Sequence, residues 1–594
     1  MLLSQRFTLA LALIAMLLSG RCSLGQETIV AAGDPKQFAL AGAGRSKADA
    51  EIVSVEGQPF SSAWRVKVRE KVGADYNLQL VCKPEELLKI GDVVLLSAYA
   101  RMIDTADESG EGRVSFVLEQ AKDPFGKVFA SSFGVGRGWQ RFDVPAVVDR
   151  DLSGTGAQVT VRVGAYVQTL EIGGIELRKF PSGTDIKSLP RTEVSYAGRA
   201  TDAPWRKAAA ESIDKIRKAS LAVTVVDASG KPMSGATVHV RMTKHAFAFG
   251  SCYSPSRILD TASPDAEKYR QTFLQLFNTG VDEYAMKWPG WNDPATRQTA
   301  LKALAWMHDH GIAVRGHNMV WPGWKRMPDQ AKASASDPDA LRKLIREHIT
   351  SIGTALRGKV IDWDVVNEPF ANNDVMTILG EDALAEWFKI AREADPSAKL
   401  YLNETNVPTS PPSDERYTAL YDRVRHIQEL GGPIDGVGMQ AHFGQNLQPP
   451  VQLLGIYDRF ATLGLPVRIT ELDIDTSDEK LQADYLRDFL TANFSHPNIN
   501  GILVWGFWES AHWRPSAAMY RKDWSPRPIA DVWKDLIFKQ WWTDQQVQTN
   551  DSGVAEVRGF LGDYEITANI GSRKATAKAA LQATGAQVKI MLPD

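Results

Sequence analysis

The stretch Trp363-Asp364-Val365-Val366-Asn367-Glu368-Pro369-Phe370 gives the first indication of the fold. Its apolar residues, with those just before them, predict a buried strand over 360–366. The strand ends at Asn-Glu-Pro, because proline donates no hydrogen bond to a neighbouring strand and disfavours helix in the residue before it. We therefore expect the carboxylate of Glu368 at the end of a strand. Alone, this motif also fits an ordinary turn, so it gains meaning only beside a second carboxylate at another strand end.

The region 245–544 around this stretch alternates between strand and helix patterns. Helical patterns, such as those over 266–277, 340–355, 383–394 and 481–494, separate the predicted strands. Those strands cover 246–250, 280–285, 313–320, 360–366, 400–402, 436–440, 467–470 and 501–504. Eight such units over about 300 residues predict a (β/α)₈ barrel, whose chemistry lies at the C-terminal ends of the strands.

A second carboxylate, Glu471, follows the seventh of these strands, whereas Glu368 follows the fourth. A barrel brings both strand ends together across its mouth. Glycoside hydrolysis needs two such carboxylates, one to protonate the leaving oxygen and one to attack the anomeric carbon or activate water. A single Glu is more simply explained as a surface or ion-paired residue, but the pair favours catalysis.

Polar residues near these carboxylates predict a supporting network. Because side chains alternate along a strand, Glu471 and Asp473 leave the seventh strand on the same side. His442 comes from the sixth strand. We expect a hydrogen-bonded chain in which His442 orients Glu471 and Asp473 fixes the imidazole tautomer. Asn367, beside Glu368, is placed to donate to the sugar 2-hydroxyl.

The regions that flank the barrel are predicted to be mainly β. Short apolar runs separated by Gly, Asp and Ser predict a β-sandwich over 26–185. Residues 186–219 read as a linker and a connecting helix over 205–218, with Asp202 as its cap and Pro204 in the first turn. A β-hairpin pattern over 220–244 and a β-rich stretch over 545–594 are each too small to be a domain, so we expect one discontinuous β-sandwich.

Composition sets limits on the function. The 594 residues predict several domains, and a net charge of −3 gives no indication of nucleic acid or of an anionic membrane surface as partner. Of 17 Trp residues, ten lie between Trp288 and Trp513. They are either core aromatics or the walls of a sugar-stacking cleft, since pyranose rings present flat apolar faces to aromatic rings.

The N-terminal residues 1–25 read as a signal peptide, with Arg6 ahead of an apolar run over 9–18 that is too short to span a membrane. We expect a secreted, periplasmic or cell-envelope protein without a membrane span. The mature chain would keep Cys82 and Cys252 in different domains, so no disulfide framework is expected. We also expect a monomer.

Cofactor chemistry has little support in the sequence. His308 and His310 lie two residues apart, but no third metal ligand is evident, and a surface helix explains both. Phosphate-binding glycine motifs are absent from the sequence. We therefore expect neither a metal nor another cofactor.

Taken together, these motifs resemble family 10 glycoside hydrolases, the β-1,4-xylanase family, over roughly 245–540. Residues 364–369 resemble the acid/base motif, which makes Glu368 the general acid/base, and 469–473 resemble the nucleophile motif, which makes Glu471 the nucleophile. The N-terminal region resembles the jelly-roll carbohydrate-binding modules often found ahead of xylanases. The β segments on either side of the barrel resemble those of plant-type members.

The same resemblance implies a set of sugar-contacting residues near the strand ends. Its motifs place Glu283, Lys287, His317, Trp321, Gln440, Trp505 and Trp513 along the substrate subsites. Four positions depart from the family pattern, namely Tyr284, Pro322-Gly323-Trp324, Glu404-Thr405 and Glu509. None of them removes a catalytic carboxylate, but all bear on the subsites.

The implied function is endo-hydrolysis of β-1,4-xylan with retention, by double displacement through a covalent glycosyl-enzyme. The departures leave two alternatives open. One is a hydrolase of another β-glycan with reshaped subsites, and the other is a carbohydrate-binding protein with weak or no catalysis.

Overall fold

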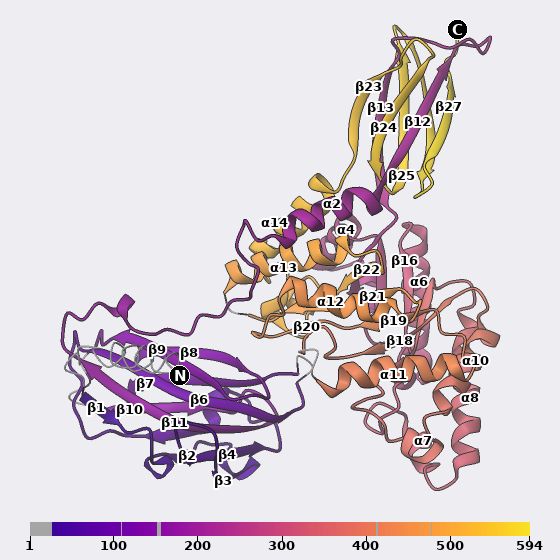
Figure 1. Ribbon diagram of the computed structural model, residues 1–594. Helices are drawn as coiled ribbons and strands as arrows, with labels where there is room; N and C mark the ends of the chain where they lie inside the picture. Colours follow the sequence, from indigo (N-terminus) through magenta and orange to yellow (C-terminus); the bar gives the residue numbers. More distant parts are fainter. Residues whose placement is uncertain (1–26, 108–109, 151, 153–155, 411–413, 477) are drawn as a thin grey trace, which may run out of the picture. The chain divides into compact units, whose positions relative to one another are not determined.

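The computed structural model describes residues 27–594 except 108–109, 151, 153–155, 411–413 and 477. The predicted signal peptide, 1–25, lies outside the described residues. The chain forms two compact units, one ending at Val194 and the other beginning at Ser195 (Figure 1).

The first unit is a β-sandwich of antiparallel strands, as the sequence predicts for its N-terminal region. Apolar side chains from both sheets, among them Val66, Leu96 and Phe116, form one core. One sheet has the order β3 (Ala48–Ser54), β4 (Ser62–Val68), β11 (Gln168–Phe180), β6 (Val93–Thr105) and β9 (Gln140–Val147), with β1 (Glu27–Val30) also on β11. The other has the order β2 (Ala39–Ala41), β5 (Gln79–Cys82), β10 (Ala157–Arg162), β7 (Gly112–Gln120) and β8 (Lys127–Val135).

The second unit contains a closed barrel of parallel strands, which confirms the predicted (β/α)₈ architecture. The strands run in the order β14 (Ala248–Tyr253), β15 (Thr279–Asp282), β16 (Ala313–Val320), β17 (Asp362–Asn367), β18 (Lys399–Glu404), β19 (Gly436–Met439), β21 (Val467–Ile474) and β22 (Ile499–Val504). Pairing of β22 with β14 closes the ring, and the short β20 (His442–Phe443) pairs in parallel with the end of β21. Each predicted barrel strand corresponds to one of these eight.

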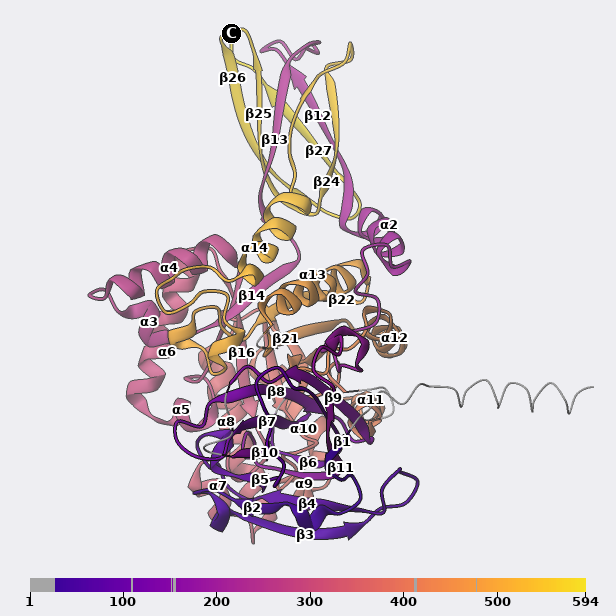
Figure 2. The same cartoon turned by 90° about the vertical axis from the view of Figure 1, so that its left-hand side faces the viewer.

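Helices surround the barrel in both views (Figures 1 and 2). The longer ones are α4 (Pro264–Leu276), α6 (Pro294–Asp309), α8 (Pro338–Ala355), α10 (Ala383–Ala394), α11 (Glu415–Glu429), α12 (Pro450–Ala461), α13 (Glu479–Ser495) and α14 (Pro528–Asp535). Shorter ones are α3 (Pro255–Leu259), α5 (Trp288–Asn292), α7 (Asp329–Ala333) and α9 (Met376–Leu379). Ser263, Asp293 and Asp337 cap α4, α6 and α8, each directly before a proline at the first helical position. This pairing of a side-chain acceptor with proline fixes where each helix begins.

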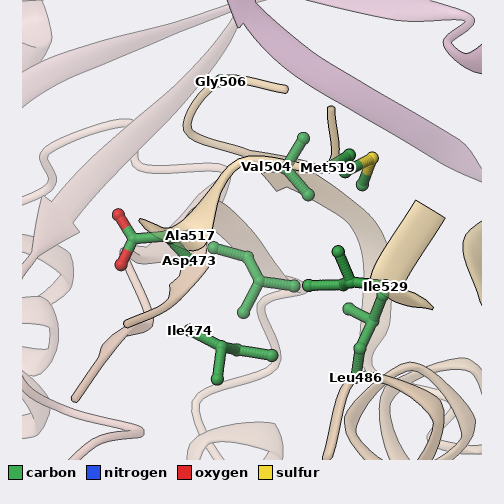
Figure 3. A pocket seen from close by; sticks show the side chains of 9 residues that line it. Asp473, Ile474, Leu486, Val504, Gly506, Ala517, Met519 and Ile529 are labelled. Carbon is green, nitrogen blue, oxygen red and sulfur yellow. The ribbon is translucent and has the colours of Figure 1, made fainter. Parts of the chain in front are cut away.

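Side chains alternate between the two faces of strand β21, so its acidic and its apolar side chains lie on opposite faces. In Figure 3, Leu486, Val504 and Ile529 form an apolar cluster, and the carboxylate of Asp473 points away from it. The strand therefore presents its acidic side chains to the barrel interior and its apolar side chains to the surrounding layer.

The remaining strands form a second, smaller sandwich from segments on both sides of the barrel. In Figures 1 and 2 the magenta strands β12 (Lys218–Val226) and β13 (Thr237–His245) lie among the yellow strands of 544–591. One sheet has the order β24 (Val554–Phe560), β12 and β27 (Ala586–Met591). The other has the order β23 (Asp544–Gln548), β13, β25 (Gly562–Ile570) and β26 (Arg573–Leu581).

The predicted hairpin of 220–244 is wrong, although both of its strands exist. β12 pairs with β24 and β27, whereas β13 pairs with β23 and β25. Each strand has one buried apolar face, with Val223 on β12 and Val240 on β13. Placing the two strands in opposite sheets turns both faces toward one shared interior.

The connecting helix α2 (Trp205–Arg217) forms where the sequence predicts it, but Asp202 does not cap it. Pro204 occupies the cap position, and among the described residues no side chain caps the first turn. Packing holds the helix instead. Trp205 lies against Ala492, and the hydroxyl of Ser212 donates to the carbonyl of Ser495 (2.6 Å).

Across the described residues, the helices are all too short or too polar to cross a membrane. Cys82 and Cys252, the two cysteines within the described part, are both buried and unbridged.

Candidate active site

Glu368 lies just past the end of β17 and is held by side-chain amides. Its backbone has a φ of 51°, a left-handed conformation that is uncommon outside glycine and is often found at functional sites. Only 5% of the residue is exposed. Its Oε1 accepts from Nε2 of Gln440 (2.7 Å) and Nδ2 of Asn367 (3.4 Å), and its Oε2 accepts from Nδ2 of Asn372 (3.1 Å).

Glu471 lies on β21 and is also buried. Its Oε2 faces Nε2 of His442 (3.3 Å), and its Oε1 accepts from Nδ2 of Asn403 (2.8 Å). Burial alone would raise the pKa of Glu471, but the hydrogen bond to His442 and the charges of His317, His442 and Lys287 outweigh it, so the pKa falls below its ordinary value. Glu471 is therefore held ready as a carboxylate.

His442 connects Glu471 to Asp473, so the predicted hydrogen-bonded chain is present. Nδ1 of His442 lies 2.9 Å from Oδ2 of Asp473, and Nε1 of Trp513 donates to the same oxygen (2.8 Å). Burial tends to raise the pKa of Asp473, but His442 and Arg514 lower it overall. Both ring nitrogens of His442 thus face acceptors that fix its orientation.

Asn403, at the end of β18, joins the two carboxylates, and the sequence analysis missed it. Its Nδ2 donates to Oδ1 of Asn367 and to Oε1 of Glu471, both at 2.8 Å. Its Oδ1 accepts from the hydroxyl of Thr470 (2.7 Å), and its carbonyl accepts from the N–H of Glu368 (2.8 Å). The only sequence signal was an amide residue near a predicted strand end, just before the Glu404-Thr405 departure.

A wall of aromatic and basic side chains continues outward from the carboxylates. The ring of Trp505 packs edge-to-face against His317 (5.2 Å between centroids, 72° between ring planes), and Nδ1 of His317 lies 2.9 Å from Oδ2 of Asp364. Nζ of Lys287 lies 5.9 Å from the ring of Trp505 and 5.1 Å from that of Trp321. These rings and the ammonium group suit the apolar faces and hydroxyls of sugars.

Three further positions singled out in the sequence, Glu283, Tyr284 and Glu404, differ in their burial and charge. Burial raises the pKa of Glu283, and the nearby positive charge of Lys287 opposes that rise. The charge state of Glu283 therefore depends on Lys287. Tyr284 is 59% exposed, which leaves its ring free at the surface. Glu404 is fully buried and accepts from the backbone N–H of Phe370 (3.0 Å), and burial raises its pKa to about 7.

The structure thus sorts the predicted residues into two groups. Glu368, Glu471, His442, Asp473, Asn367 and Gln440 belong to one hydrogen-bonded cluster around the two carboxylates. Lys287, His317, Trp321, Trp505 and Trp513 line its surroundings, and Glu283 is linked to them through Lys287.

His308 and His310 lie on the surface near the end of α6, where His310 stacks on Trp306. Within the described part of the chain, no group of three or more His, Cys, Asp or Glu side chains is arranged to hold a metal ion.

Comparison with known proteins identifies the family. The fold and the paired carboxylates at strand ends define a barrel of the glycoside hydrolase type. The model of glycosyl hydrolase family 10 matches residues 239–535, half of the chain, and the chain belongs to this family. The resemblance noted in the sequence is therefore confirmed.

The chain is similar to several curated proteins. It is 34% identical over 386 residues to anti-sigma-I factor RsgI6 of Acetivibrio thermocellus, covering 64% of this chain and 49% of that protein. It is 29% identical over 388 residues to endo-1,4-beta-xylanase 2 of Arabidopsis thaliana, covering 64% and 35%. The chain thus spans half or less of these relatives' lengths.

Among solved structures, the chain is similar to xylanase 10B from Thermotoga petrophila RKU-1 in complex with xylobiose. The identity is 24%, the TM-score is 0.46, and the match covers 50% of this chain and 95% of that one.

Proposed function

We propose that the protein hydrolyses β-1,4-xylan within the polymer and retains the anomeric configuration. The observation that carries this proposal is the amide bridge between Glu368 and Glu471, in which Asn403 bonds both Glu471 and the neighbour of Glu368. Such a bridge suits two carboxylates that act on opposite sides of one bond. Membership of family 10 and the names of the curated xylanases point to the same substrate.

In the first step, Glu471 attacks the anomeric carbon while Glu368 gives its proton to the leaving oxygen. The bond from the anomeric carbon to that oxygen breaks, and an ester bond to Glu471 forms. The lowered pKa of Glu471 keeps it ionised for this attack, and His442 holds its oxygen in place. Asn367 donates to Glu368 and is linked to Glu471 through Asn403, a position from which it can donate to the 2-hydroxyl of the same sugar.

In the second step, Glu368 takes a proton from water, and that water attacks the anomeric carbon. The ester bond breaks, Glu471 regains its carboxylate, and the two inversions together give retention. The amides around Glu368 are neutral, so the group can change its protonation state between the steps without leaving a charged partner unpaired.

The substrate is tested with a panel of polysaccharides that includes xylan, mixed-linkage glucan and cellulose. Release of reducing sugar from xylan alone, with internal cuts seen as a fast fall in viscosity, is the expected result. Preferential hydrolysis of a glucan would contradict xylan as the substrate but not the proposed two-step mechanism. No hydrolysis of any polymer would favour a carbohydrate-binding protein.

The mechanism is tested separately by NMR of the first anomer released. We expect the β-anomer to appear before mutarotation. Early appearance of the α-anomer would exclude the covalent route.

Export is the second part of the proposal. We propose that residues 1–25 direct the chain out of the cytoplasm and are removed, and that the mature protein is a monomer. N-terminal sequencing of the protein recovered from an expressing bacterial host, with light scattering of the purified product, checks both. An intact Met1 in the recovered protein would contradict removal.

A further inference from the structure

The loop after β17 brings a third amide to the carboxylate of Glu368. Nδ2 of Asn372 donates to Oε2 (3.1 Å), whereas Gln440 and Asn367 both donate to Oε1. The motifs in the sequence did not single out Asn372, because they end at Pro369. Oε2 therefore has an amide donor of its own, supplied by the loop that follows Glu368.

The neighbouring loop after β16 holds Asn372 in this position. A Cβ added at Gly323 would lie 2.6 Å from Oδ1 of Asn372, so glycine leaves the room that this side chain uses. The N–H of Trp324 donates to Oδ2 of Asp374 (2.8 Å), and the N–H of Val375 donates to the carbonyl of Pro322 (3.1 Å). These bonds fasten the two loops together.

This packing also accounts for one departure from the family pattern. All three residues of this tripeptide contact the loop that carries Asn372. The carbonyl of Pro322 and the N–H of Trp324 form hydrogen bonds to it, and the missing side chain of Gly323 leaves room for Asn372. The unusual tripeptide and Asn372 thus form one unit that ends on the carboxylate of Glu368.

We propose that Asn372, held by Gly323, is a positioning residue for the acid/base Glu368. This inference rests on the proposed function. When Glu368 gives its proton to the leaving oxygen, negative charge develops on its carboxylate. An N–H already aimed at Oε2 stabilises that charge more in the transition state than in the protonated ground state. In the second step, the same bond orients Glu368 as it takes a proton from water.

The test uses aryl β-xylobiosides with leaving groups of different acidity. Phenol departs only with a proton from the acid, whereas dinitrophenol departs without one. We expect Asn372→Ala to lower kcat/KM roughly ten-fold for the phenyl substrate, the size expected for one hydrogen bond to a charged group. For the dinitrophenyl substrate, kcat/KM should be unchanged. A purely structural defect would lower both values together.

Two companion variants sharpen the result. Asn373→Ala removes the same side chain one position later, where it is exposed and makes no side-chain hydrogen bond within the described part of the chain, and should match the wild type on both substrates. Gly323→Ala keeps Asn372 but pushes its side chain away, and should reproduce the selective loss. Thermal unfolding of each variant checks that the barrel is intact.

Equal losses on the two substrates, or no loss on either, would overturn the role of Asn372 while leaving the proposed function standing. A wild-type enzyme that cleaves neither xylan nor any aryl xylobioside would overturn the proposed function and this inference with it.

Discussion

The barrel interior contains two buried charged clusters, and they are built in opposite ways. Below the site, Arg315 donates to Asp362 (2.6 Å) and Asp364 (2.7 Å), and Arg468 also donates to Asp362. Each carboxylate there meets a guanidinium. At the mouth, Glu368 and Glu471 meet amides and an imidazole instead.

The pKa directions follow from this difference. Burial would lower the pKa of Arg315, but Asp362 and Asp364 raise it overall, so its charge is fixed. Burial would likewise raise the pKa of Asp364, but Arg315 and His317 lower it overall. Permanent ion pairs make the lower cluster a structural element. Neutral amide donors leave Glu368 able to exchange protons, which the proposed mechanism requires, whereas His442 and Lys287 keep Glu471 ionised.

The largest expected effect comes from Glu471→Gln at the mouth. The amide cannot form the ester, so we expect kcat on xylan to fall by roughly 10⁴-fold or more. The unfolding midpoint should change little, because an amide fills the same space. Steady-state assays with calorimetry check this, and a variant that keeps full activity would remove Glu471 from the nucleophile role.

A substitution in the lower cluster should affect folding rather than chemistry. Arg315→Met removes the guanidinium that donates to the buried carboxylates of Asp362 and Asp364. Its loss costs about 3–5 kcal/mol of unfolding free energy. Denaturant unfolding measures the loss. If Arg315→Met instead kept its stability and lost activity, it would be wrong to assign stability to the lower cluster and chemistry to the upper one.

Asn403→Ala tests the bridge between the carboxylates. It removes donors to Asn367 and Glu471, and we expect kcat to fall roughly ten- to hundred-fold, with a small change in KM. Gln428→Ala on α11 serves as the control, because that amide is exposed and donates to the carbonyl of Leu463, away from both carboxylates. Equal effects of both substitutions would contradict a role for Asn403 at the site.

The smallest expected effect is a change in pH dependence. The hydrogen bond to His442 lowers the pKa of Glu471, and the nucleophile must be ionised. In His442→Gln the acidic limb of kcat/KM should therefore move to higher pH. Rates measured across pH 3–9 on one aryl xylobioside would show it, and an unmoved limb would mean that another group protects Glu471.

The same lowering has a consequence for stability. A carboxyl group with a lowered pKa in the folded state stabilises the fold above its unfolded pKa, and this contribution is lost as the pH falls through the folded pKa. The barrel mouth should therefore weaken in acid, and less so in His442→Gln.

The barrel was predictable because each strand is a short apolar run followed by polar residues, as in 360–366 before Glu368. Strands with weaker apolar patterns were not predicted, such as β8 with its Ser131-Ser132 pair and the Lys- and Ala-rich β26. The partners of β12 were also beyond reach, since Lys218 pairs with Phe560, hundreds of residues away, and no local signal records that pairing.

Within the site, the charged and aromatic residues and the motif amides Asn367 and Gln440 could be predicted from the sequence, but Asn403 and Asn372 could not. Asn403 and Asn372 matter because of where two loops and a strand end place them. An asparagine near a strand end is common, and only its hydrogen-bond partners in the structure distinguish it.

The split sandwich has a consequence for synthesis of the protein on the ribosome. β12 and β13 leave the exit tunnel before the barrel, whereas β24, β25 and β27 follow it. At about 5–20 residues per second, the early strands wait on the order of tens of seconds for partners. During that interval their unpaired edges are open to other nascent chains. Completion of the fold therefore depends on strands that emerge after the barrel, even though the residues of the candidate site all lie within the barrel.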